Sequence, residues 1–290
     1  MSAVGATAVQ TAPRVAHGTP REPKRRWTRF ILPSYTAAFI LYLCFPIFVI
    51  ILFSFNNTDT GFGTAPRVKT TWIGFTTVWY QRLFDIPDLT TALQHSLLIA
   101  FLASTTAAAV GALLGLSLAR YRYRGKGTTN LVIFLAISAP EVVLGAALVS
   151  FFVTLGLPRG LGTIFVSHVM FSIPFVAVTV RARAANLDRS LEDAAMDLGA
   201  NPFVTFWKVT LPLIFPGILA GWLLAFALSM DDFVITQFVS GPGATMFPTW
   251  VFGATKVGIP PHVFVFATLI FAGGLVLAGV LVLVSRRRPV

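Results

Sequence analysis

The amino-acid sequence predicts an all-α integral membrane protein with six transmembrane helices and both termini in the cytoplasm. Hydrophobic residues make up 56% of its 290 residues and charged residues only 11%, whereas soluble domains are roughly 25% charged. The mean hydropathy is +0.78. Long apolar runs recur along the chain, and basic residues collect in alternate segments between them. Because so few charges cannot cover a soluble surface, we expect lipid to solvate most of the protein.

Six apolar runs are long enough to cross a membrane as helices, since a span needs about 20 residues. The third run contains Glu141 and the fifth contains Asp231 and Asp232, whereas the others contain no Asp, Glu, Lys or Arg. Gly111 and Gly115 in the second run form a G-x-x-x-G pattern, which favours close contact with another helix. The runs cover residues 30–55, 92–119, 131–157, 161–180, 209–239 and 263–284.

The segment before the first run, residues 1–29, is rich in Ala, Pro, Thr and Arg. This composition cannot supply a hydrophobic core, so we predict a disordered, basic cytoplasmic tail, followed by a membrane domain over residues 30–288. The apolar run after the tail is about twice as long as the core of a cleavable signal peptide, which argues against one. An Arg-rich mitochondrial presequence stays an alternative.

The net charge of +11 can indicate either a nucleic-acid-binding surface or a membrane topology. If the amino terminus lies inside, most of the 22 Lys and Arg fall on inner segments. Because basic residues collect in cytoplasmic loops, this bias predicts that both termini are cytoplasmic. No basic surface is left for nucleic acid, although the tail could bind anionic lipid. The outer segments hold only Arg67, Lys69, Arg82, Arg159 and Lys256.

The inner loop at residues 181–212 is more polar than its surroundings, and we predict two short helices in it. Ser190 is the predicted N-cap of the first helix, with Asp193 as its capping-box partner. Gly199 suits the left-handed position that ends a helix, and Asn201 followed by proline suits the start of the next. From spacing alone, the loop could be an ordered connection, or a helix that fits a groove on another protein.

The same loop resembles the EAA signature of the permeases of binding-protein-dependent ABC importers. That signature reads Glu-Ala-Ala, three residues, Gly, nine residues, Ile-x-Leu-Pro. This chain has Asp-Ala-Ala at 193–195, Gly199 and Val-Thr-Leu-Pro at 209–212, so charge and shape are preserved at both departures. The resemblance, which covers about residues 93–284, implies the type I ABC importer permease fold and a coupling helix that docks on a cytoplasmic ATPase. The residues implied in coupling are Ser190, Glu192, Asp193, Ala194, Ala195, Asp197, Gly199, Leu211 and Pro212.

The sequence contains no phosphate-binding loop of the form G-x-x-x-x-G-K-[ST], and the nearest string, Gly-Lys-Gly at 125–127, lacks the flanking residues. We therefore expect no enzymatic activity and no cofactor or metal in this chain, with ATP bound by partner ATPase subunits. His95, His168 and His262 fall on different segments, and we expect each of them to be structural or interfacial rather than a metal ligand.

Acids inside the apolar runs need a reason to be there. Glu141 follows Pro140, at a predicted helix break about ten residues into the third run and near the midplane. A charged side chain at the centre of a lipid-facing helix costs ~2.5–3.5 kcal/mol, so Glu141, Asp231 and Asp232 should face a wet cavity or a partner. Adjacent residues point about 100° apart on a helix, so only one Asp can face a given axis. The acids could line a cation path, fix helix packing, or lie near the outer headgroups.

Residues 187–200 and 221–245 resemble the spermidine/putrescine permeases within this family, and the Pro140-Glu141 step resembles a Pro-acid step there. A polyamine carries several positive charges on an apolar stem, so spaced carboxylates and aromatic rings suit it. The candidate path residues are Glu141, Asp231, Asp232, Trp222, Phe226 and Phe233.

The resemblance implies a multi-pass protein of the bacterial inner membrane that works in a larger assembly. The implied partners are a second homologous permease, two ATPase subunits and an extracytoplasmic polyamine-binding protein, in addition to membrane lipid. The alternatives are an ABC permease for iron(III), phosphate or another anion, and a proton-coupled secondary transporter or channel. A membrane enzyme is disfavoured because no catalytic constellation is present in the sequence.

Overall fold

A computed structural model describes residues 28–57 and 72–286. In these residues the secondary structure is helical, apart from an isolated antiparallel bridge between Asn56 and Phe75. The chain divides into two compact units, Met1–Ile50 and Ile51–Val290. The predicted tail, residues 1–29, lies outside the described residues except for its last two, which begin the first helix.

The first unit contributes most of α1, which covers Thr28–Phe53. This helix matches the first apolar run, and its segment Phe30–Phe53 is long and apolar enough to cross a membrane. Pro33 and Pro46 lie inside the helix. Proline is more frequent in membrane helices than in soluble ones, so their presence fits a membrane span.

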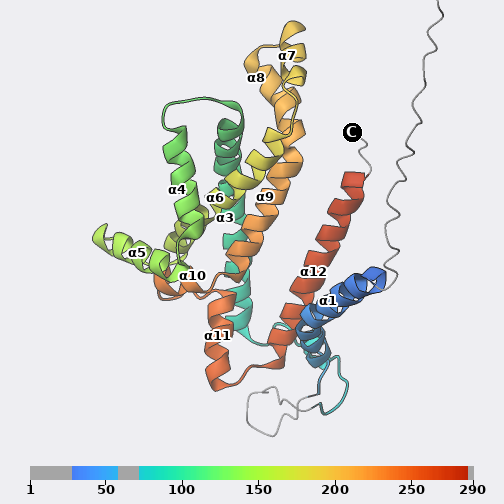
Figure 1. Ribbon diagram of the computed structural model, residues 1–290. Helices are drawn as coiled ribbons and strands as arrows, with labels where there is room; N and C mark the ends of the chain where they lie inside the picture. Colours follow the sequence, from blue (N-terminus) through green and yellow to red (C-terminus); the bar gives the residue numbers. More distant parts are fainter. Residues whose placement is uncertain (1–27, 58–71, 287–290) are drawn as a thin grey trace, which may run out of the picture. The chain divides into compact units, whose positions relative to one another are not determined.

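The core of the second unit is a bundle of three long helices, α3 (Pro87–Arg120), α6 (Leu161–Ala185) and α9 (Leu211–Asp231), shown in Figure 1. Small side chains let them approach closely. A Cβ atom on Gly111 would lie 2.7 Å from the Val176 Cβ, and one on Gly115 would clash with the backbone of α6. The contact predicted from the G-x-x-x-G pattern is therefore confirmed, and α6 is the partner.

The third apolar run forms two helices, α4 (Lys126–Ser138) and α5 (Glu141–Thr154), bent by 107°. Pro140 has no backbone N–H and disfavours the helical conformation in the residue before it, so Ala139 is extended with ψ 133°. The predicted break is confirmed. A continuous span over residues 131–157 is not observed, because the chain turns sharply at this step and α5 packs against α10.

The fifth run also stops early. After α9 ends at Asp231, the chain forms the short helices α10 (Val234–Val239) and α11 (Phe247–Val257) at one end of the bundle (Figure 1). The last helix, α12 (Pro261–Arg286), begins beside α2 (Val78–Gln81).

Within the described residues, four helices are long and apolar enough to cross a membrane, or five if the bent pair α4 and α5 counts as one span. The last apolar run lies in α12, of which Pro261–Val276 qualifies only as a shorter apolar helix. The all-α membrane fold is therefore established, whereas the count of six spans and the cytoplasmic termini stay predictions.

Candidate functional site

The polar loop after α6 forms two short helices, as predicted. α7 covers Ser190–Asp197 and α8 covers Pro202–Thr205, and a single π-helical turn, η1 (Phe206–Thr210), leads into α9. Gly199 has a φ of +89°, and its N–H donates to the Met196 carbonyl at 2.9 Å. The predicted left-handed C-terminus of α7 is thus confirmed.

The sequence predicts the N-cap of α8 correctly but not that of α7. Asn201 accepts a hydrogen bond from the Val204 N–H at 2.9 Å, which confirms it as the N-cap of α8. The assignment of Ser190 as N-cap of α7 is wrong. Ser190 is the first helical residue, and its N–H donates to the Asp188 carboxylate at 3.0 Å. An ionised carboxylate is a stronger acceptor than a hydroxyl, and this bond holds the pKa of Asp188 below its usual value.

Glu192 ties the loop to the bundle. Its carboxylate lies 3.6 Å from the Arg120 guanidinium at the end of α3, and it accepts a 3.0 Å hydrogen bond from the Thr210 hydroxyl. Arg189 also donates to the Arg120 carbonyl. Sequence reasoning missed Arg120, because the two ends of the ion pair lie on segments far apart in the chain. Its position directly after an apolar run gives no signal of a partner.

The face of the loop that points away from the helix bundle is exposed and partly apolar. No residue of α7 is buried, and the side chains of Leu198 and Phe203 are 90% and 71% exposed. Asp193 and Ala194 are also exposed, whereas Glu192 faces the bundle. The other predicted coupling residues divide as follows: Ser190, Asp197, Gly199 and Pro212 are exposed, and Ala195 and Leu211 are half-buried.

The acid pair at the opposite end of the bundle has two different environments. Asp232 is buried and accepts hydrogen bonds from the N–H groups of Ile235 and Thr236, at 3.3 and 2.8 Å, and from the Thr236 hydroxyl at 2.7 Å. Its carboxylate also lies 3.2 Å from Nε2 of His168 on α6. Asp232 therefore caps α10 and joins it to α6. Its predicted role as a path residue is not supported by this geometry.

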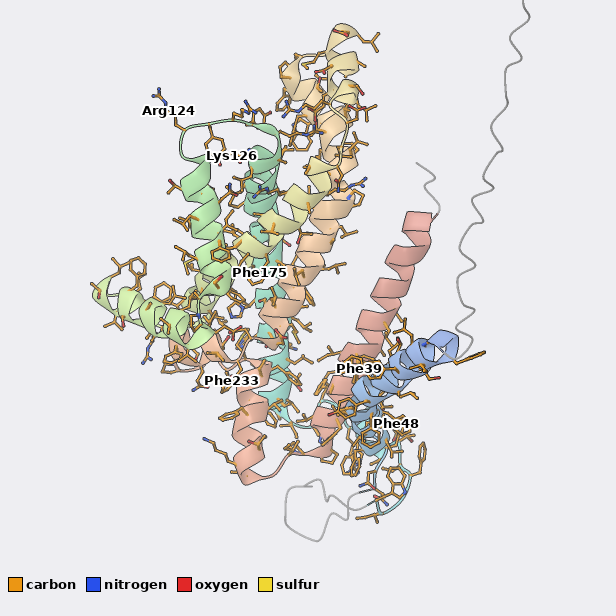
Figure 2. All side chains as sticks on the ribbon, viewed as in Figure 1. Phe39, Phe48, Arg124, Lys126, Phe175 and Phe233 are labelled. Atoms are coloured by element: carbon orange, nitrogen blue, oxygen red, sulfur yellow. The ribbon has the colours of Figure 1, made fainter. Side chains whose placement is uncertain are left out.

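Asp231, by contrast, is exposed and lines a mostly apolar cavity of about 590 Å³. The cavity lies between the end of α9, α11 and α12. Phe233, labelled in Figure 2, also lines it, and its ring centroid lies 4.5 Å from that of Phe252. Phe252 lines the cavity too, and the remaining lining residues are Met230, Phe247, Pro248, Val251, Thr255, Ala267, Ile270 and Phe271.

The other two predicted aromatic contacts face elsewhere. Trp222 donates its indole N–H to the Thr105 hydroxyl of α3 at 3.1 Å, and its ring stacks on Phe226 with centroids 5.5 Å apart. Neither residue lines the cavity that contains Asp231. The structure thus brings Asp231 and Phe233 together and leaves Trp222 and Phe226 on the face of α9 toward α3.

Glu141 is the first residue of α5, where an acid is favoured by the helix dipole. The predicted helix break lies directly before it, and because the chain bends by 107° there, the rise along one straight helix does not give the depth of Glu141. Its side chain is exposed, and no contact among the described residues joins it to Asp231 or Asp232.

Comparisons with known proteins agree with this architecture. Residues 111–289 match the family model described as "Binding-protein-dependent transport system inner membrane component". The chain is 38% identical over 258 residues to the spermidine/putrescine transport system permease protein PotC of Escherichia coli strain K12, covering 89% of this chain and 93% of that protein. It is 41% identical over 236 residues to the putrescine transport system permease protein PotI of the same strain, covering 79% and 81%.

Solved structures show the fold. A chain in the crystal structure of a bacterial ABC transporter involved in import of the acidic polysaccharide alginate has a TM-score of 0.62 and 18% identity, covering 92% of this chain and 99% of that one. The type I ABC importer permease fold implied by the EAA loop is confirmed by this likeness. The protein therefore belongs to the family of inner-membrane components of binding-protein-dependent transport systems.

Proposed function

We propose that this protein is a permease subunit of an ATP-driven polyamine importer. It forms half of the translocation pore with a second homologous permease, receives putrescine or spermidine from an extracytoplasmic binding protein, and couples to two ATPase subunits that bind ATP in its place. The observation that carries the proposal is the 38% identity to a spermidine/putrescine permease across 89% of the chain. The exposed coupling loop and the acidic, aromatic cavity suit the same role.

The proposed topology has six spans with both termini in the cytoplasm, over a permease domain of residues 30–288. Two predicted inner segments support it. The turn between α3 and α4, with Arg124 and Lys126, lies at the same end of the bundle as α7 (Figure 2). The inner end of α6 also reaches α4, because Arg181 donates to Asn130 at 2.6 Å. The predicted outer residue Lys256 lies on α11, at the opposite end, over the Phe252 ring.

The proposed path uses Asp231 as its principal carboxylate. An exposed acid beside Phe233 and Phe252 offers one end of a polyamine an ion pair and its methylene stem an aromatic surface. Glu141 is a second acid, available to a neighbouring part of the path because it is exposed and forms no ion pair within residues 28–57 and 72–286. Trp222 and Phe226 serve as stem contacts further along α9. Asp232 acts indirectly, through the break that it stabilises.

The proposed coupling runs through α7. When the ATPase subunits close, they move the exposed face of the loop around Asp193 and Ala194. The Glu192 contacts to Arg120 and Thr210 transmit this motion to the inner ends of α3 and α9, since those residues end one helix and precede the other. The bundle then opens outward and accepts the substrate.

Uptake by proteoliposomes that contain the complete transporter tests the function. Labelled putrescine and spermidine should accumulate only with ATP and the binding protein, and Glu141→Gln combined with Asp231→Asn should reduce accumulation strongly. Asp88→Asn removes an exposed acid at the start of α3, outside the proposed path, and serves as the control. Unchanged uptake in the double variant would refute the cation path. ATP-driven uptake of iron(III) or an anion in place of polyamines, or uptake without an ATPase, would refute the proposed substrate or mechanism.

A further inference from the structure

A histidine on α6 bridges the break between α9 and α10. Nδ1 of His168 lies 2.7 Å from the hydroxyl of Ser229, which precedes the break, and Nε2 lies 3.0 Å from the hydroxyl of Thr236, which follows it. Nε2 also lies 3.2 Å from the carboxylate of Asp232, inside the break. One imidazole ring therefore contacts both sides of the break and the residue between them.

The hydrogen bonds assign the proton on this ring. The Thr236 hydroxyl has one proton and lies 2.7 Å from the Asp232 carboxylate, to which it donates. It must then accept from His168, so Nε2 carries a proton and donates toward both Thr236 and Asp232. The side chains of His168 and Asp232 are only 1% and 4% exposed. Breaking these bonds would therefore leave buried polar groups without a partner, at a cost in free energy. The ring has one orientation in which all partners are satisfied.

The position of Asp231 depends on this arrangement. Asp231 is the last residue of α9, and Asp232 has an extended backbone with ψ 115°. Neighbouring side chains diverge by about 100° at a helix end, so fixing the Asp232 side chain toward α6 turns that of Asp231 away from α6, toward the cavity that Phe233 and Phe252 line. Loosening Asp232 would let α9 rotate or extend and would move the Asp231 carboxylate.

We propose that His168 is a positioning residue for transport: through Asp232 it holds the break after α9 and thereby fixes the Asp231 carboxylate at the cavity. This inference rests on the proposed function, because Asp231 matters only if a cation passes it. His168 itself touches no substrate.

Glutamine and asparagine at position 168 test the roles of the two ring nitrogens separately. Glutamine places its N–H₂ group near Nε2 and keeps the bond to Asp232, whereas asparagine reaches only as far as Nδ1 and keeps the contact with Ser229. For the complete transporter in proteoliposomes, polyamine taken up per ATP hydrolysed should fall roughly tenfold in His168→Asn, as expected for a lost buried bond to a charged group. His168→Gln should restore most of it. His95→Asn, on α3 outside this network, is the matched control.

The decisive comparison repeats His168→Asn in an Asp231→Asn background. If His168 acts through Asp231, the second substitution causes no further loss of uptake per ATP. An equal fold loss in both backgrounds, or no loss in the wild-type background, would overturn the inference. If His168→Asn does not assemble, Thr236→Val removes the hydroxyl that joins Nε2 of His168 to the Asp232 carboxylate and allows the same comparison. A wild-type transporter that takes up no polyamine would instead refute the proposed function.

Discussion

The ion pair that ties the coupling loop to α3 should respond asymmetrically to loss of its two members. The side chain of Arg120 is 9% exposed and that of Glu192 is 22% exposed. Glu192→Gln leaves a largely buried guanidinium whose other acidic neighbour, Asp188, is fully exposed. The Nε atom of Arg120 has no hydrogen-bond partner among the described residues. Arg120→Met leaves a carboxylate that water can reach and that still accepts from Thr210. The first substitution should therefore destabilise the protein more than the second.

The magnitudes follow from this burial. Breaking a fully buried pair costs about 3–5 kcal/mol. Because Glu192 is partly exposed and its carboxylate lies 3.6 Å from Arg120, Glu192→Gln should cost about 2–3 kcal/mol. Arg120→Met should cost about 1 kcal/mol, since solvent screens the remaining charge. The double variant leaves no unpaired charge, so its cost should resemble that of Arg120→Met, which gives a coupling energy of about 2 kcal/mol.

The assay is heat unfolding of the purified, assembled transporter. One kcal/mol corresponds to about 2–4 °C for chains of this size, so Glu192→Gln should lower the midpoint by about 4–12 °C and Arg120→Met by about 2–4 °C. Uptake per ATP hydrolysed, measured in the same preparations, should follow the same order, because the proposed coupling runs through this pair. Additive effects in the double variant, or an equal loss from either single substitution, would refute the reasoning.

Two further predictions concern packing and capping. Gly115→Ala should destabilise the protein by about 1–3 kcal/mol, because the new methyl group meets the backbone of α6. Gly253→Ala in α11 has open space around the new methyl group and should be neutral or stabilising. Thermal unfolding distinguishes the two variants, and equal effects would contradict the packing argument. Asn201→Ala should cost about 1 kcal/mol by removing the acceptor for Val204 N–H, measured as faster proteolysis of the coupling loop; Asn201→Ser should restore protection, and failure to do so would argue against the cap.

The sequence predicts local features well where one local rule decides them. Pro140 removes a backbone donor, so the break between α4 and α5 could be foreseen, but not its angle of 107°. Gly199 and Asn201 are placed correctly because their conformations depend on neighbouring backbone. Ser190 is misplaced because Asp188, two residues earlier, offers a competing acceptor, and its carboxylate is the stronger one.

The environments of Asp231 and Asp232 could not be predicted from local sequence rules. The angle between adjacent helical side chains requires Asp231 and Asp232 to face different surroundings, but it cannot say which one faces the cavity. That choice depends on His168, whose segment precedes the pair by about sixty residues and reaches it only through packing of α6 on α9. The same limit hides Arg120 from sequence reasoning about Glu192.

The sequence by itself determined that this protein is a helical membrane protein, because composition and the length of apolar runs reflect transfer into lipid, residue by residue. It also determined the position of the polar loop at residues 181–212, because a spaced motif is a property of the chain. Only the tertiary structure decided which acid is buried and which is exposed at the cavity, and which residues connect the loop to the bundle. Both features depend on burial and on contacts between segments that are far apart in the sequence. Burial and contacts set the free energy of a charged side chain, and a pattern along the sequence does not contain them.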